Sequence, residues 1–184
     1  MGCLSRPMSQ FLPSLGRVLL LQNGPQDLPY STSLLAGSIA AGIVANVLSL
    51  AVGTSTLVAI PQTLLATLIS AGFVVGLLQI RERTPRTVQT LTALFATQAV
   101  LGVLALFPLN ALAPIFQQLA ENPDAASTIE APSAAVGAWL ALGLWSVLVT
   151  GHIFRHALDV HLIAGMGLAL LQGMLIWLVL LPLA

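Results

Sequence analysis

All three histidines of the chain lie close together, at His152, His156 and His161. Arg155 and Asp159 share a helical face with the first two, because the offsets from His152 are three, four and seven residues. Two imidazoles at this spacing can bind one metal ion, with Asp159 and His161 as further ligands. The stretch lacks the glutamate of the His-Glu-x-x-His signature, so metal binding by these four residues is the weaker interpretation.

Two other interpretations of this stretch remain open. Haem or quinone binding would use the same imidazoles, although the axial ligands of a haem usually come from facing helices. In the structural interpretation, Arg155 pairs with Asp159, His152 orients the helix end at the membrane interface, and His161 caps the turn. We predict this structural or partner-docking role, with no cofactor. No Gly-x-Ser-x-Gly elbow occurs, so no catalytic residue is predicted.

The composition of the chain indicates the class of protein in which these residues occur. Of 184 residues, 57% are hydrophobic and 7% are charged, whereas soluble domains carry about 25% charged residues. The formal net charge is zero, so no basic face indicates a nucleic-acid partner. A single cysteine, Cys3, excludes an intramolecular disulfide. The sequence therefore predicts an all-α, polytopic protein whose main partner is the lipid bilayer.

Five apolar runs are long enough to cross a bilayer, which takes about 20 residues. We expect Pro61 in the first turn of the second run, Pro108 at the end of the third and Pro182 at the end of the fifth. The predicted architecture is an interfacial segment, residues 1–32, followed by a transmembrane domain, residues 33–184. The predicted spans are residues 33–52, 61–80, 88–107, 134–153 and 162–181.

The N-terminal segment has apolar residues at three- and four-residue spacing, which predicts an amphipathic helix on the membrane surface, interrupted early by Pro13. A cleavable signal peptide is not expected, because the apolar region is short and an Ala-x-Ala site is missing. Arg6 stands where the myristoylation pattern has Ser or Thr, so we expect an unmodified tail around Cys3. Met8 is an alternative start to Met1.

The arginines predict the orientation. With five spans, every arginine falls on the side of the N-terminus, while the opposite side carries only acidic residues between the third and fourth spans. The positive-inside rule then places the N-terminus in the cytoplasm and the C-terminus outside. The arginines on this side are Arg6, Arg17, Arg81, Arg83, Arg86 and Arg155.

Between the third and fourth spans, the apolar spacing over residues 109–120 predicts a short surface helix, and residues 121–133 read as a flexible linker. Within the spans, small residues recur every four positions and predict close helix packing inside the bundle, although a homo-oligomer would use the same stripes. These stripes are Gly37-Ala41-Ala45, Gly137-Ala141 and Gly165-Ala169-Gly173.

Polar side chains inside the spans are expected to form hydrogen bonds between helices or to line a polar cavity. No acidic or basic residue occurs within a span, whereas ion-coupled transporters usually mark their pathway with one. Transport is therefore the weaker interpretation. The polar residues concerned are Asn46, Gln79, Gln89, Thr90, Thr97, Gln98 and Gln172.

Two short pieces carry a resemblance to a known family. They are Pro-Gln-Asp-Leu-Pro-Tyr-Ser at residues 25–31 and Gly-His-Ile-Phe-Arg-His-Ala-Leu at residues 151–158. Together with five spans, they resemble small bacterial inner-membrane proteins whose topology is similar to the Yip family, named for interaction with Ypt/Rab GTPases. The resemblance implies a non-enzymatic protein with a cytoplasmic N-terminal segment. It also implies that the two pieces are neighbours on the cytoplasmic face.

From these observations we predict a non-enzymatic scaffold or assembly protein that docks a membrane or peripheral protein at its cytoplasmic face. The first alternative is an accessory subunit of a membrane redox complex, with histidines near a metal, haem or quinone. The second is a small transporter. The predicted docking or orienting residues are Asp27, Arg81, Arg83, Arg86, His152, Arg155, His156 and Asp159.

Overall fold

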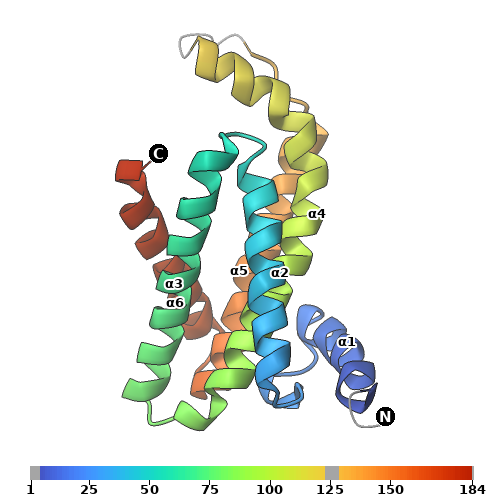
Figure 1. Ribbon diagram of the computed structural model, residues 1–184, viewed down its shortest axis with the longest axis vertical. Coiled ribbons are helices and arrows are strands. Elements are labelled where there is room, and N and C mark those ends of the chain that lie inside the picture. Colours follow the sequence, from blue (N-terminus) through green and yellow to red (C-terminus); the bar gives the residue numbers. More distant parts are fainter. Residues whose placement is uncertain (1–4, 123–128, 184) are drawn as a thin grey trace.

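The protein is a bundle of α-helices (Figure 1). The computed structural model describes residues 5–122 and 129–183, and these contain no strand. The all-α prediction is confirmed. In chain order the elements are α1 (Ser5–Leu19), η1 (Pro25–Asp27), α2 (Thr32–Leu50), α3 (Thr56–Ile80), η2 (Thr84–Arg86), α4 (Thr87–Glu121), α5 (Ser133–Leu158), α6 (Leu162–Leu180) and η4 (Leu181–Leu183).

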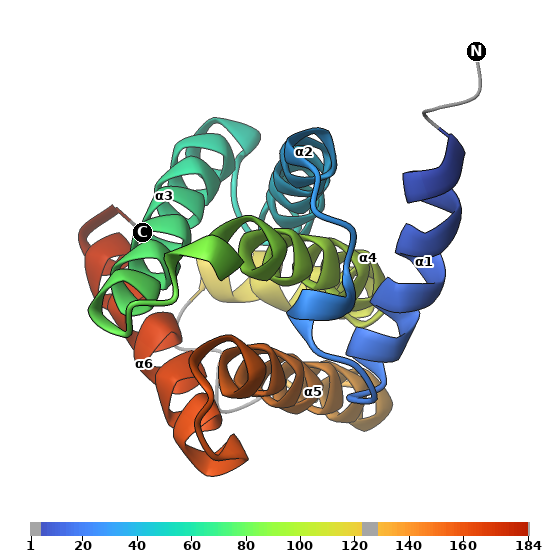
Figure 2. The ribbon, with the colours of Figure 1, turned by 90° about the horizontal axis from the view of Figure 1, so that it is seen from below.

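Five of these helices, α2 to α6, are long and apolar enough to cross a membrane, as predicted. Helix α1 lies beside the bundle at the end where the loop between α3 and α4 and the turn between α5 and α6 also lie, although the α3–α4 loop is on the opposite side of the bundle (Figures 1 and 2). We call this the arginine-bearing end. The C-terminus and the last turns of α4 lie at the opposite end (Figure 1).

Helix α4 lies in the middle of the bundle, with α2 and α3 on one side and α5 on the other (Figure 2). Its residues are buried without a break from Thr90 to Thr97, so this stretch contacts neighbours all round its circumference. The main hydrophobic core forms at the same level, towards the arginine-bearing end. Its buried members are Val74, Leu78, Leu91, Leu94, Phe95, Phe154, Ala157, Leu158 and Ala169.

The predicted end of the third span at Pro108 is wrong. Helix α4 runs through Pro108 and Pro114 to Glu121, so the expected separate surface helix is its continuation. An interior proline removes one backbone hydrogen bond and bends a helix without having to end it. Here Pro108 and Leu112 are both buried, so packing against the bundle supports the turns on either side of the proline. The last turns extend past the bundle and bend across its end, above the turn between α2 and α3 (Figure 1).

Two other proline predictions are also wrong, for a similar reason. Helix α3 begins at Thr56, so Pro61 lies beyond its first turn. Helix α1 continues through Pro13, because Leu15 and Val18, on its far side, are buried at 6% and 0% exposure. Val18 packs with residues of α4 and α5, and this contact holds the C-terminal half of α1 in place. Helix α1 is therefore attached to the bundle as well as being amphipathic.

Two predictions concern residues outside the described ranges. The unmodified tail around Cys3 falls on residues 1–4, and much of the expected linker falls on residues 123–128. Elsewhere the predicted spans agree with the helices within a few residues. Besides α3 and α4, one further helix differs from its predicted span. Helix α5 continues five residues past the predicted end at residue 153.

Close helix contacts in the bundle depend on glycine, but only partly on the predicted stripes. At Gly165 of α6, an added Cβ would collide with the backbone oxygen of Gly151 in α5. At Gly151 it would lie 2.8 Å from the backbone nitrogen of Met166, so α5 and α6 touch backbone to backbone here. By contrast, an added Cβ at Gly37, Gly137 or Gly173 meets nothing within 4 Å, and their predicted role in close packing is wrong.

Candidate functional site

The arginine-bearing end is organised around the last turn of α5. The helix ends because Asp159 adopts a left-handed conformation, with φ 53° and ψ 52°. The backbone N–H groups of Asp159 and Val160 then turn back to the carbonyl of Arg155. The final carbonyls of a helix have no partner within it and carry its partial negative charge, so they require donors from elsewhere.

Two arginines from the α3–α4 connection supply these donors. Nη1 of Arg86 lies 2.8 Å from the carbonyl oxygen of His156 and 3.3 Å from that of Ala157. Nη2 of Arg81 lies 3.4 Å from the carbonyl oxygen of Leu158. A guanidinium group suits this role because it is permanently charged and presents several N–H donors in one plane.

Arg86 and a third arginine of this connection, Arg83, bind the side chain of Asp159. Nη2 of Arg83 lies 2.9 Å from Oδ2, and Nη1 of Arg86 lies 3.3 Å from Oδ1. The expected pair between Arg155 and Asp159 does not form among the described contacts, and that prediction is wrong. It assumed that the helix continues through Asp159, whereas the left-handed residue takes the carboxylate off that face. We call Arg81, Arg83, Arg86 and Asp159 the arginine cluster.

The N-terminal segment is attached beside this cluster. Nε2 of His152 lies 3.0 Å from the carbonyl oxygen of Asn23, and the histidine is only 4% exposed. Nε2 of Gln89 donates to the carbonyls of Gln26 and Leu28, at 3.0 and 2.7 Å. These bonds join residues that are at least 61 positions apart in sequence. They seat the turn η1 against α4 and α5, which both contact it.

Asp27 acts within this turn. Its Oδ2 accepts a hydrogen bond from the backbone N–H of Gly24 at 3.0 Å, which closes the turn on itself. Leu28, the next residue, is 2% exposed and packs in a small core with Val18, Val149 and Ile153. The sequence pieces 25–31 and 151–158 are therefore neighbours in space, through the contact of η1 with α5.

The four predicted metal ligands are not brought together. Among residues 5–122 and 129–183, no group of three His, Cys, Asp or Glu side chains is placed to hold a metal ion. The rings of His152 and His156 pack edge to face with centroids 4.5 Å apart. Asp159 is directed to the arginines, and His161 is exposed at the start of α6. The geometry gives the metal interpretation no support.

All eight predicted docking or orienting residues lie at this end of the bundle, but in two different settings. Asp27, Arg81, Arg86 and His152 hold segments of the chain together. Arg155 is exposed and forms no hydrogen bond or ion pair with the described part of the chain. His156 is partly exposed beside it, and Arg83 and Asp159 are paired yet remain 43% and 50% exposed.

Sequence reasoning did not assign Asn23 or Gln89 to this site, although it expected Gln89 to form hydrogen bonds or line a cavity. Gln89 was recognisable as an amide at the start of an apolar run, a position where a polar side chain needs a partner. Asn23 contributes only its backbone carbonyl, so no property of its side chain reveals it.

Comparisons of the chain with protein-family models, curated proteins and solved structures found no match.

Proposed function

We propose that the protein is a non-enzymatic, multi-pass protein of the bacterial inner membrane that docks another membrane or peripheral protein. The arginine-bearing end would be its cytoplasmic face, with the N-terminus inside and the C-terminus outside. The distribution of the arginines supports this orientation, because cytoplasmic loops of membrane proteins carry an excess of basic residues.

One observation carries the proposal: several segments that are distant in sequence are fixed to one another at this end. The arginine cluster joins the α3–α4 connection to the end of α5. His152 and Gln89 attach the N-terminal turn to α5 and α4. A surface held in this way loses little conformational entropy when a partner binds, which favours affinity.

The exposed charges on this surface are the groups available to a partner. Arg155 has no partner within the described residues, while Arg83 and Asp159 present both signs of charge at the same end of the bundle. Charge pairs at the rim of an interface mainly set specificity and the rate of association. We therefore assign Arg155 and His156 to partner contact, and Arg81, Arg86, Asp27 and His152 to orienting the surface.

The resemblance to the Yip family supports the same proposal, because its eukaryotic members act as membrane scaffolds. The redox alternative draws no support from the geometry. His152 uses its Nε2 on a backbone carbonyl, and its ring packs against His156. The hydrogen bond to Asn23 therefore accounts for His152 within the chain.

Site-specific photo-cross-linking in cells tests the docking proposal. We expect a photo-reactive amino acid placed at His161, which is exposed beside the arginine cluster, to give one discrete cross-linked product. The same amino acid at Leu57, which is 86% exposed at the opposite end, should give none. Arg155→Glu should abolish the product, because it reverses the charge offered to the partner.

Arg17→Glu is the matched control, since it reverses an exposed arginine of α1 outside the arginine cluster and should leave the product intact. The proposal is wrong if His161 gives no discrete product, or if the product survives Arg155→Glu. A product of twice the mass of the chain would also contradict it, because the partner would then be a second copy.

A further inference from the structure

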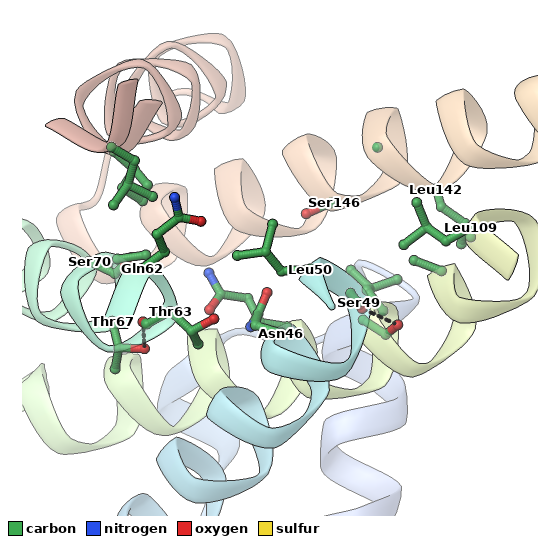
Figure 3. A pocket seen from close by; sticks show the side chains of 18 of the residues that line it. Asn46, Ser49, Leu50, Gln62, Thr63, Thr67, Ser70, Leu109, Leu142 and Ser146 are labelled. Carbon is green, nitrogen blue, oxygen red and sulfur yellow. Dashed lines mark hydrogen bonds between the residues drawn. The ribbon is translucent and has the colours of Figure 1, made fainter. Parts of the chain in front are cut away.

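A cavity of about 560 Å³ opens in the half of the bundle away from the arginine-bearing end. All five membrane-crossing helices contribute to its wall (Figure 3). Its size falls within the range of about 300–1,000 Å³ that is typical of small-molecule sites. The polar side chains used below are Asn46, Gln62, Thr63, Ser70, Gln98 and Ser146.

A packed hydrophobic core lies between the cavity and the arginine-bearing end. Ser70 of α3 and Gln98 of α4 line the cavity. On the same two helices, Val74 and Phe95 lie closer to the arginine-bearing end and belong to the hydrophobic core. This packed layer separates the cavity from the arginine cluster. The arrangement suits a binding site and does not form a path across the bundle.

The wall combines uncharged polar groups with hydrocarbon. None of its lining residues is acidic or basic, and Leu50, Leu142 and Ile176 cover part of it. A charged ligand would be desolvated here without a counter-charge, which is strongly unfavourable. Amide and hydroxyl groups instead donate and accept hydrogen bonds with neutral groups. The wall therefore suits a molecule with an uncharged polar group attached to an apolar body.

The polar groups converge from different helices. Figure 3 shows the side chains of Asn46, from α2, and Gln62, from α3, reaching the same space. Asn46 donates one amide hydrogen to the carbonyl of Gly42 at 2.8 Å. An amide has a second donor hydrogen and an acceptor oxygen besides, and both can serve a ligand. Gln62 and Thr63 are 6% and 4% exposed, although they lie in a segment that crosses the membrane.

Gln172 gives an independent indication that hydrogen-bonding groups near this cavity are not all satisfied by the protein itself. It is 3% exposed, and its amide nitrogen has no hydrogen-bond partner within residues 5–122 and 129–183. It lies four residues before Ile176, which lines the cavity, and therefore on the same face of α6. An unpaired amide in a membrane-crossing helix is costly, because no water in the hydrocarbon region can satisfy it.

We propose that this cavity binds one uncharged lipid from the bilayer. Its hydroxyl or ester groups would bond to Asn46, Gln62 and Gln98, and its hydrocarbon would lie along Leu142 and Ile176. A membrane lipid fits better than a water-soluble solute, because a purely polar molecule would leave the apolar part of the wall without contacts.

Thermal unfolding of the purified protein in detergent tests this proposal. Dioctanoylglycerol, an uncharged lipid with short chains, should raise the unfolding temperature by about 5 °C at saturation. Dioctanoyl phosphatidic acid carries the same chains on a charged head group and should have little effect. Glycerol, which has the polar groups without the chains, should also have little effect.

Gly143→Leu is the decisive variant. Gly143 lines the cavity, and an added Cβ there meets nothing within 4 Å, so leucine should fill the space without a clash. We expect it to weaken the response to dioctanoylglycerol at least tenfold in concentration. Gly137→Leu is the matched control on the same helix, because that site is equally open but lies outside the cavity lining.

The proposal is wrong if dioctanoylglycerol fails to stabilise the wild type, or if phosphatidic acid or glycerol stabilises it equally. It is also wrong if Gly143→Leu responds like Gly137→Leu. Should Gly143→Leu fail to fold, Ser146→Phe fills the same cavity from the same helix and must show the same loss of response.

Discussion

Gly165→Ala is expected to lower the free energy of unfolding by about 3 kcal/mol. The added Cβ collides with the backbone oxygen of Gly151 and would lie 3.1 Å from the backbone nitrogen of Arg155. Both obstacles are backbone atoms, so the clash is relieved only by moving α6 away from α5. The unfolding temperature should fall by about 6–12 °C.

Two glycines of the same helix serve as controls for this prediction. An added Cβ at Gly167 or Gly173 meets nothing within 4 Å, so Gly167→Ala and Gly173→Ala should leave the unfolding temperature unchanged or slightly raised. If Gly165→Ala were as stable as these two variants, the backbone contact between α5 and α6 would be contradicted.

Arg86→Ala is expected to lower the free energy of unfolding by about 2 kcal/mol. It removes hydrogen bonds to the carbonyls of His156 and Ala157 and to the carboxylate of Asp159. These carbonyls then end α5 without a cationic partner. Thermal unfolding measures the loss, and amide hydrogen exchange should quicken in the last turn of α5.

Two arginine variants make this prediction specific. Arg86→Lys keeps the charge but loses the planar set of donors, so its stability should lie between wild type and Arg86→Ala. Arg155→Ala, at an exposed arginine with no bond to the described residues, should change stability by less than about 0.5 kcal/mol. Equal losses for Arg86→Ala and Arg155→Ala would show that the arginine cluster does not hold α5.

The membrane-crossing helices were largely predictable, because a long apolar run determines a span by itself. The ends of helices at prolines were not. Pro13, Pro61 and Pro108 each read as a boundary or a first-turn residue, yet each lies inside a continuous helix. Burial of the turns beyond Pro13 and around Pro108 depends on neighbouring helices that no local pattern specifies.

The candidate site was predictable in its location but not in its contacts. The side on which the arginines fall follows from counting spans, and this places Arg81, Arg83 and Arg86 near the end of α5. The pairing of Arg83 and Arg86 with Asp159 depends on the left-handed conformation of Asp159. Residue spacing along a helix does not predict the direction of a side chain there. The cavity required the packing of five helices, although Asn46 and Gln98 were recognisable as polar residues within spans.

Cysteine labelling gives the most direct test of the central claim, that the docking surface faces the cytoplasm. In a Cys3→Ser background, which removes the only native cysteine, Thr84→Cys marks the arginine-bearing end and Glu130→Cys marks the loop between α4 and α5. A maleimide that cannot cross membranes should label Glu130→Cys in spheroplasts, and Thr84→Cys only after permeabilisation. Labelling of Thr84→Cys in sealed spheroplasts would contradict the account, because the docking surface would then lie outside the cell.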